Sequence, residues 1–241
     1  DGVTFTYPTG GAPALSDISF TLGHGKTLGI IGGTGSGKST LIGLIPRFYD
    51  VQEGCVKVDG CDVRQYPLET LRRKIGLVPQ KALLFKGTIR ENLLWGDEGA
   101  TDDEIRDALR AAQAQEVVDG KPEGLDYEVE TGGRNFSGGQ RQRLTIARAL
   151  VRRPELLILD DSASALDFAT DAALRRALRE LPWHPAVVII SQRTASIRFA
   201  DEILVLDDGR LAGKGTHDEL LETCEVYREI YESQFKKEDA R

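Results

Sequence analysis

The chain has 241 residues, 40% of them apolar, and its 31 basic and 38 acidic side chains give a formal net charge of −7. This length and composition are enough to bury a large core, which excludes a disordered tail and a small disulfide-stapled scaffold. The acidic balance argues against a general nucleic-acid binder, because such proteins carry a basic surface.

The first third of the chain predicts a strand-rich region around one glycine-rich loop. The segments expected here are strands at 3–7, 18–22, 27–31 and 75–78 and a helix at 39–48. Asp59-Gly60 predicts a two-residue hairpin turn that sets Val58 opposite Cys61. Cys55 then faces Arg64, and three cysteines do not form a disulfide framework, so we expect free thiols.

The remainder predicts alternating helices and strands. The expected helices span 88–95, 102–115, 137–152, 167–181 and, as a pair, 217–237, with a polar loop at 120–133. The expected strands span 156–159, 186–190 and 202–206. The first two are uninterrupted apolar runs, typical of a parallel sheet buried on both faces. The alternation predicts a doubly wound α/β fold with a helical insertion. No apolar run approaches the roughly 20 residues that span a bilayer.

Residues 32–39 read Gly-Gly-Thr-Gly-Ser-Gly-Lys-Ser and fit the phosphate-loop pattern G-x-x-x-x-G-K-[ST] at every fixed position. Glycines let successive N–H groups turn around a polyphosphate, and the following helix adds its positive end. Lys38 is expected at the β- and γ-phosphates of ATP and Ser39 on Mg²⁺. The preceding strand and following helix favour this reading over a chance glycine-rich turn. The nucleotide-binding residues predicted in this segment are Gly32, Gly33, Thr34, Gly35, Ser36, Gly37, Lys38, Ser39 and Thr40.

Asp160 follows the buried strand at 156–159, at the edge where open α/β sheets bind ligands. Many strands end in a turn-forming aspartate, so this position alone says little. Combined with the phosphate loop, it predicts that Asp160 holds Mg²⁺ directly or through water.

Ser137-Gly138-Gly139 heads a helix and predicts a second anion site, with an N-cap serine and exposed N–H groups but no lysine. With the phosphate loop, this segment resembles the nucleotide-binding domain of ABC transporters, whose signature LSGGQ reads Phe-Ser-Gly-Gly-Gln at 136–140 here. The resemblance covers essentially the whole chain. It implies a P-loop NTPase α/β core with a parallel sheet flanked by helices, an N-terminal antiparallel β-subdomain and an inserted α-helical signature subdomain.

The resemblance also implies domain boundaries and further site residues. The RecA-like ATP-binding core with its β-subdomain is expected at 1–85 and 143–241, and the helical subdomain at 86–142. Tyr7 matches the aromatic residue that stacks on adenine, although the residue alone reads as an ordinary edge-strand tyrosine. Gln80 matches the glutamine that touches Mg²⁺ and couples to the membrane domain. The implied metal ligands are Ser39, Gln80 and Asp160.

Two such domains pair head to tail in this family, with each ATP between them. The residues implied to act on the partner's nucleotide are Ser137, Gly138, Gly139, Gln140 and Asp167. The segment Gly-Thr-Ile-Arg-Glu-Asn at 87–92 resembles exporter half-transporters, in which a transmembrane domain precedes the ATPase domain. We therefore expect an upstream transmembrane domain, a location at the cytoplasmic face of a membrane, and no nucleic-acid partner.

Two positions depart from the family pattern. Asp161 stands where active members carry a glutamate that polarises water, and aspartate is shorter by about 1.5 Å. Gln192 stands where members carry a histidine that contacts the γ-phosphate. With Lys38 these are the implied catalytic residues, and the pair of departures resembles the degenerate half of a heterodimeric exporter. The alternatives are a fully competent homodimeric ATPase, a regulatory ATP-binding module, and a soluble ABC ATPase acting on ribosomes or DNA.

Overall fold

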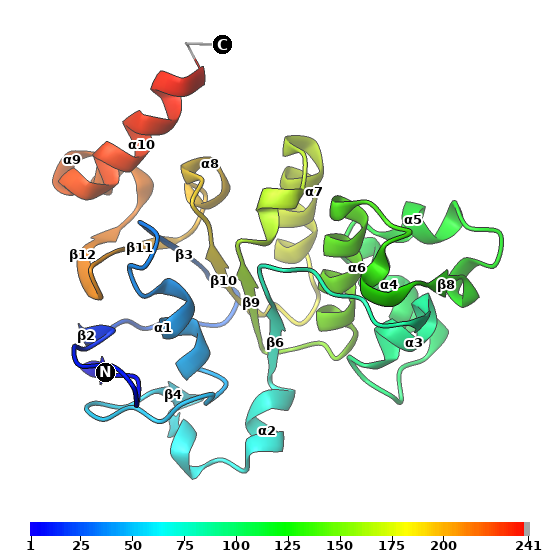
Figure 1. Cartoon of the computed structure of the whole chain (residues 1–241), viewed down its shortest axis with the longest axis horizontal. Helices are drawn as coiled ribbons and strands as arrows, with labels where there is room; N and C mark the ends of the chain where they lie inside the picture. The colour runs from blue at the N-terminus through cyan, green and yellow to red at the C-terminus, as the bar shows by residue number, and fades with distance from the viewer. Residues whose placement is uncertain (239–241) are drawn as a thin grey trace. The chain divides into compact units, whose positions relative to one another are not determined.

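The computed structural model describes residues 1–238 and has the predicted α/β class, with a mostly parallel sheet, flanking helices and antiparallel strands near the N-terminus (Figure 1). The chain divides into two compact units, one built from residues 1–75 and from residue 187 onward, the other from residues 76–186. The assignment of 86–142 as a helical subdomain remains a prediction. Within residues 1–238, no helix is both long and apolar enough to cross a membrane.

The sheet of the first unit has the strand order β12–β11–β3–β10. These strands are β3 (Thr27–Gly32), β10 (Ala186–Ile190), β11 (Glu202–Asp207) and β12 (Arg210–Gly215). β10 and β11 both run parallel to β3, and β12 is antiparallel to β11. All residues of β10 are buried, as its uninterrupted apolar sequence predicts for a strand covered on both faces.

The N-terminal strands β1 (Val3–Phe5) and β2 (Leu15–Ile18) are antiparallel, with Val3 opposite Ile18. The strand expected at 18–22 is therefore wrong in its bounds. Leu15 and Ile18 are the fully buried residues that pair with β1, whereas the side chains at 20 and 22 are only half-buried. β1 also ends before Tyr7, which lies in the loop that follows it.

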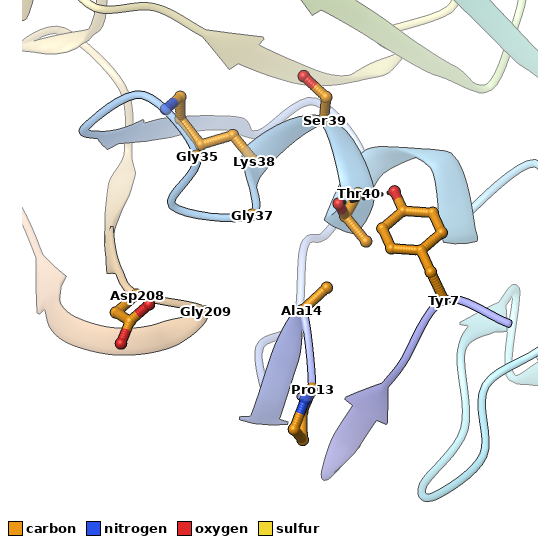
Figure 2. A pocket seen from close by; sticks show the side chains of 10 residues that line it. All are labelled: Tyr7, Pro13, Ala14, Gly35, Gly37, Lys38, Ser39, Thr40, Asp208 and Gly209. Atoms are coloured by element: carbon orange, nitrogen blue, oxygen red, sulfur yellow. Dashed lines mark hydrogen bonds between the residues drawn. The ribbon is translucent and has the colours of Figure 1, made fainter. Parts of the chain in front are cut away.

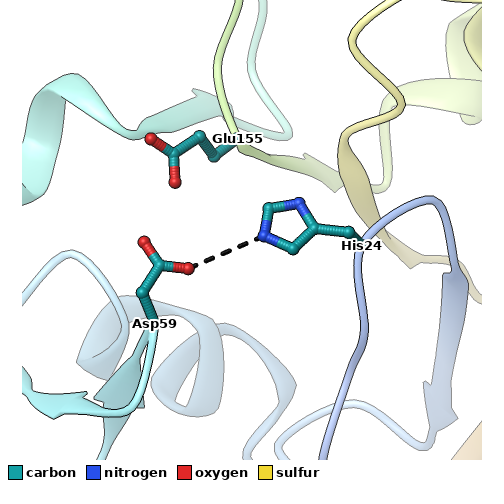
Figure 3. A group of neighbouring side chains, drawn as sticks. All are labelled: His24, Asp59 and Glu155. Atoms are coloured by element: carbon teal, nitrogen blue, oxygen red, sulfur yellow. Dashed lines mark ion pairs between the residues drawn. The ribbon is translucent and has the colours of Figure 1, made fainter.

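The predicted hairpin is confirmed, with β4 (Lys57–Val58) antiparallel to β5 (Cys61–Asp62) and Val58 opposite Cys61. Asp59 and Gly60 have φ values of 50° and 75°, the left-handed pair that a tight hairpin turn requires. The Asp59 carboxylate lies 3.7 Å from His24 Nε2 and accepts a hydrogen bond from Lys74 Nζ at 2.9 Å. Figure 3 shows the His24 contact at the tip of the hairpin.

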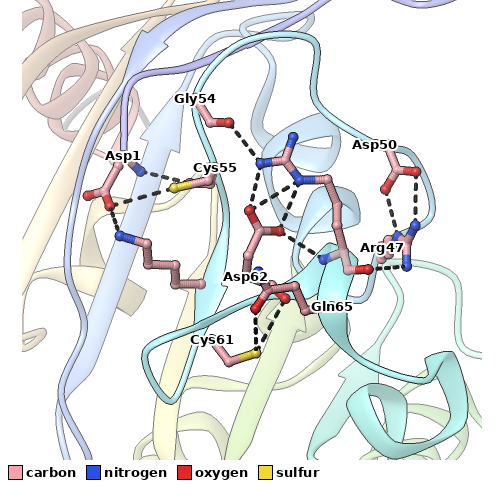
Figure 4. A network of polar contacts seen from close by, with 10 residues as sticks. Asp1, Arg47, Asp50, Gly54, Cys55, Cys61, Asp62 and Gln65 are labelled. Carbon is pink, nitrogen blue, oxygen red and sulfur yellow. Dashed lines mark hydrogen bonds and ion pairs between the residues drawn. The ribbon is translucent and has the colours of Figure 1, made fainter.

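Polar contacts hold the rest of this β-region (Figure 4). Asp62 accepts from Arg64 Nη2 at 2.6 Å, and Asp1 accepts from Lys57 Nζ at 2.9 Å. The hydrogen bonds from Arg64 lower the pKa of the Asp62 carboxyl. Cys55 and Cys61 belong to the same network, and all three cysteines of the chain are free thiols, as expected.

The helices of the first unit are α1 (Lys38–Leu44), α2 (Leu68–Arg73), α8 (Thr194–Ile197), α9 (His217–Thr223) and α10 (Glu225–Glu238), with a 3-10 turn, η1 (Val63–Gln65). α1 is shorter than the helix expected at 39–48, because Pro46 cannot donate a helical hydrogen bond and Arg47 is left-handed. α10 lies against β11, β12 and α9 (Figure 1).

The second unit contains β6 (Ile75–Val78) beside β9 (Leu156–Asp160) and a group of helices. The helices are α3 (Ile89–Leu94), α4 (Asp102–Ala111), α5 (Gln115–Asp119), α6 (Gly138–Val151) and α7 (Phe168–Arg179). The short elements are β7 (Gly87–Thr88), β8 (Glu128–Val129), η2 (Gly124–Asp126), η3 (Thr131–Gly133) and η4 (Ser162–Ala165). α3 and α4 both pack against α6.

The single helix expected at 102–115 is two helices, α4 and α5. Gln113 adopts a left-handed φ of 55° and donates to Arg110 O, while Ala114 N donates to Leu109 O at 2.7 Å. These two bonds form the motif that closes many helices at their C-terminus. Ala114 is buried there, and the chain turns before α5 begins.

Candidate functional site

The phosphate loop joins the end of β3 to the start of α1. Gly35 and Gly37 have φ values of 82° and 99°, which side chains with a Cβ rarely adopt. Gly37 is the N-cap of α1, and no side chain caps it, so the N–H groups and the positive helix end face a possible anion. A Cβ on Gly33 or Gly35 would meet no atom of the described chain within 4 Å. This open side gives a ligand access to the backbone.

Lys38 is buried and reaches back over the loop. Its Nζ donates to Gly33 O at 2.6 Å, to Gly32 O at 2.9 Å and to Ser36 Oγ at 3.2 Å. A buried ammonium is costly unless strong acceptors surround it, and phosphate oxygens are such acceptors. Lys38 and the loop N–H groups therefore fit a polyphosphate, and the adjacent Ser39 hydroxyl is an oxygen ligand of the kind that Mg²⁺ takes.

A cavity of about 320 Å³ opens beside the loop, within the usual range for small-molecule sites (Figure 2). Its lining residues are Tyr7, Pro13, Ala14, Gly35, Gly37, Lys38, Ser39, Thr40, Asp208 and Gly209. The hydroxyls of Tyr7 and Thr40 are hydrogen-bonded at 2.9 Å, and the Tyr7 ring contacts Phe5 edge-on. Tyr7 and Lys38 thus line the same cavity. A single nucleotide there could place its base against Tyr7 and its phosphates against Lys38.

The cavity also includes residues that the sequence did not point to. Asp208 and Gly209 form the turn between β11 and β12. Gly209 N donates to Ser36 O and Gly209 O accepts from Ser16 N, so this turn packs against the phosphate loop. No local pattern marks such a contact, because it joins segments more than 170 residues apart in the chain.

Gln192 follows β10 at the carboxyl edge of the sheet. Ile190 pairs with Ile30 of β3, and Ser191 N donates to Ile30 O at 3.2 Å. Because β3 leads into the phosphate loop and runs parallel to β10, Gln192 leaves the sheet on the ligand-binding edge. Its side chain is exposed there. This location suits the predicted γ-phosphate contact, and the contact itself remains a prediction.

In the second unit, Asp160 ends β9 and Asp161 follows in a left-handed conformation with φ 46°. Gln80 Nε2 donates to Asp161 Oδ2 at 3.1 Å, so two of the predicted site residues lie together. Aspartate is among the few residues that tolerate this backbone region. The predicted Mg²⁺ ligands come from both units, Ser39 from the first and Gln80 and Asp160 from the second. Their joint role remains a prediction.

Ser137 is the N-cap of α6, as predicted. Its Oγ accepts from Gln140 N at 3.2 Å, and Gln140 Oε1 accepts from Ser137 N at 2.9 Å, which completes a capping box. Gly138 faces open space within the described chain, whereas a Cβ on Gly139 would lie 3.2 Å from Ala165 O. The capping box therefore holds the first turn of α6 in place, and the backbone at Gly138 is not covered by other residues of the described chain.

The first turns of α1 and α6 are unusual in charge. Among the α-helices described within residues 1–238, only α1, α6 and the four-residue α8 lack an acidic residue in the first turn. An acidic residue there would offset the positive helix end. The two helices that begin at the predicted phosphate contacts thus keep that positive end available to an anion.

Asp167 is the N-cap of α7. It accepts hydrogen bonds from Thr170 N and Thr170 Oγ1, both at 2.8 Å, and these bonds lower the pKa of its carboxyl. Its side chain is thus engaged within its own helix, and its contact with a second domain remains a prediction. The next residue, Phe168, is an exposed apolar side chain.

Comparisons with known proteins agree with these features. The family model described as ABC transporter matches residues 15–164. An uncharacterised ABC transporter ATP-binding protein of Mycobacterium tuberculosis (strain H37Rv) is 48% identical over 97% of this chain and 40% of its own length. An ATP-dependent lipid A-core flippase of Vibrio cholerae is 45% identical over 97% of this chain and 40% of its own length. The chain therefore spans about 40% of the length of these curated relatives.

A solved structure is also similar over nearly the whole chain. A bacterial Atm1-family ABC exporter with ATP bound matches with a TM-score of 0.92 and 38% identity, over 97% of this chain and 41% of that one.

Proposed function

Because the chain belongs to the ABC transporter family, we propose that it binds ATP with Mg²⁺ and that its ATPase cycle powers export of a substrate across a membrane. Its proposed partners are a second ABC nucleotide-binding domain, head to tail, and a transmembrane domain. Its proposed location is the cytoplasmic face of that membrane. The exporter relatives and the similar exporter structure support this reading.

The phosphate loop carries the ATP-binding part of the proposal. An uncapped helix start, an open backbone cradle and the Lys38 ammonium converge on the cavity that Tyr7 also lines. Lys38 is proposed to contact the β- and γ-phosphates, and Tyr7 to stack on the adenine. Mg²⁺ would be held by Ser39, Gln80 and Asp160, where its charge offsets that of the transferring phosphoryl group.

A patch on the second unit supports a protein partner at the helical region. Leu83, Phe85 and Trp95 are exposed, and the rings of Phe85 and Trp95 stack at 4.5 Å. The Arg148 guanidinium lies 5.5 Å from the Phe85 ring, and its buried Nη1 has no hydrogen-bond partner among the described residues. Buried polar groups in proteins rarely lack a hydrogen-bond partner. We propose that the transmembrane domain covers this patch and supplies an acceptor for Arg148.

The finer proposal is that this chain is the degenerate half of a heterodimer. The shorter Asp161 is held by Gln80, and Gln192 cannot carry the positive charge that histidine can. Position 161 is proposed to orient the attacking water and position 192 to contact the γ-phosphate, so both departures fall at groups needed for hydrolysis. The signature segment, which would serve the partner's site, is intact. Hydrolysis at the chain's own site is therefore proposed to be slow.

Titration with ATP and phosphate-release assays, on the chain alone and with its partner domain, test these proposals. The heterodimer reading expects tight ATP binding by this chain, little turnover alone, and strong stimulation by a different partner. Turnover that rises with the square of this chain's own concentration would instead indicate a competent homodimer. ATP binding without turnover in any complex would indicate a regulatory module, and loss of ATP binding altogether would contradict the core proposal.

A further inference from the structure

One side chain of the C-terminal helix reaches the loop that carries Gln192. The Gln234 Nε2 group of α10 donates to Gln192 O at 2.7 Å. The Gln234 Oε1 atom accepts from Thr194 N and from Thr194 Oγ1, both at 3.0 Å. A single amide therefore bonds to the backbone on both sides of Arg193, from forty residues further along the chain.

These bonds fix a short loop that has few internal contacts of its own. α8 begins at Thr194, and its N-cap residue Arg193 offers no side-chain cap, so Gln234 supplies the missing acceptor. On the other side, Arg193 N donates to Ser191 Oγ at 2.9 Å, and Ser191 and Thr194 are both buried. The backbone around Gln192 is thereby held, while the Gln192 side chain is left exposed on the ligand-binding edge.

The helix that carries Gln234 is itself anchored. Tyr227 is 0% exposed, and its hydroxyl is hydrogen-bonded to His217 Nδ1 at 2.8 Å, so α10 is tied to α9. Tyr227, Tyr231 and Gln234 follow one another at spacings of four and three residues, which brings them to one face of the helix. The Gln234 amide thus projects from a packed surface rather than from a free tail.

We propose that Gln234 is a positioning residue that aims Gln192 at the γ-phosphate of bound ATP, so that the C-terminal helix tunes how well this site distinguishes ATP from ADP. The inference rests on the proposed function, because it takes the γ-phosphate contact of Gln192 from there. Gln234 itself need not touch the nucleotide. Fixing the loop in advance lowers the entropy lost when the contact forms.

The test is the affinity of the chain for ATP and for ADP, each with Mg²⁺, in Gln234→Ala. We expect the ADP affinity to stay within about twofold and the ATP affinity to fall roughly three- to tenfold, about the worth of the single hydrogen bond that Gln192 is proposed to make to the γ-phosphate. Gln234→Glu keeps the acceptor for Thr194 but sets a carboxylate oxygen against Gln192 O in place of the donor, so it should weaken ATP binding at least as much as Gln234→Ala. Ser233→Ala is the matched control, because Ser233 Oγ donates to Ile230 O within α10. It should bind both nucleotides as the unmodified chain does.

A double-mutant cycle separates positioning from a general effect on the fold. In the Gln192→Ala background no side chain remains to aim, so adding Gln234→Ala should not weaken ATP binding further. Amide exchange at Thr194 should quicken in Gln234→Ala, without a matching rise in the β3 core. A full additional loss of ATP affinity in the double variant would overturn the inference, as would unchanged exchange at Thr194.

The cycle also distinguishes failure of this inference from failure of the proposed function. If Gln192→Ala alone leaves the ATP-to-ADP affinity ratio unchanged, the γ-phosphate contact is wrong, and both ideas fall. If Gln192→Ala lowers the ratio but Gln234→Ala does not, only the positioning role is wrong. If Gln234→Ala does not fold, Gln234→Glu and its combination with Gln192→Ala give the same comparison.

Discussion

Restoring the two departing residues should accelerate hydrolysis at this chain's own site. The change is Asp161→Glu together with Gln192→His, in the complex with the partner domain. Glutamate would extend the carboxylate by one carbon–carbon bond, about 1.5 Å. The Asp161 carboxylate is now held at 3.1 Å by Gln80 Nε2. An extension of that size moves the carboxylate from its present position against this amide and should let it orient water.

The expected size of the effect follows from the rate enhancement that a correctly positioned general base provides. General-base catalysis contributes ~10²–10⁴-fold, so a gain of at least about tenfold is expected, or about 1.4 kcal/mol off the barrier. Both changes should be needed, since a base without a γ-phosphate contact leaves the transition state under-supported. The gain has a cost in stability. Asp161 has φ 46°, and a glutamate in that left-handed region should lower the free energy of unfolding by about 1 kcal/mol.

Phosphate release is the assay, with the catalytic carboxylate of the partner domain removed so that only this site contributes. Asp161→Glu alone and Gln192→His alone are the controls. Urea unfolding of the same variants measures the cost in stability. If the unmodified chain already turns over as fast as the double variant, the degenerate-site reasoning is refuted, and Asp161 is an adequate base where it stands.

Three further predictions concern separate parts of the chain. Lys38→Ala should abolish tight binding of ATP with Mg²⁺ while circular dichroism stays unchanged; retained affinity in a titration would contradict the phosphate-loop assignment. Ser137→Arg should suppress the partner's phosphate release and spare ATP binding to this chain; the reverse result would exclude head-to-tail pairing. Arg64 lowers the pKa of Asp62, so this pair stabilises fully above the ordinary carboxyl pKa and fades as the pH falls through the lowered value. Asp62→Asn should therefore flatten the acid-induced loss of stability in urea unfolding, and an unchanged pH profile would show that the pair contributes nothing.

Features with a strong local signal could be predicted from the sequence. The phosphate loop, the apolar runs at 156–159 and 186–190, the Asp59-Gly60 turn and the N-cap at Ser137 each depend on residues within a few positions of one another. Their backbone conformations follow from glycine freedom, side-chain capping and burial. For these elements the expectation and the structure agree.

Features that depend on distant partners could not be predicted. β2 is placed by its pairing with β1, which selects 15–18 over the equally alternating 18–22. β7 and β8 are two residues each and exist only because they pair across 40 residues of chain. The Gln234 contacts likewise join α10 to the Gln192 loop. Such pairings depend on how the whole unit packs, and a short stretch of sequence does not reveal that packing.

The capping box of α6 has a consequence for how this helix tolerates variation. In α3, α4 and α9 the third helical residue, which closes the box, is a glutamate, whereas α6 uses the neutral Gln140. Gln140→Glu would preserve every cap hydrogen bond and satisfy the helix dipole better, so it should fold at least as well. It would also set a negative charge at the point proposed to receive a phosphate. Screens that score variants by abundance or melting temperature will therefore not detect the loss of function from this substitution, whereas phosphate release at the partner's site and transport will.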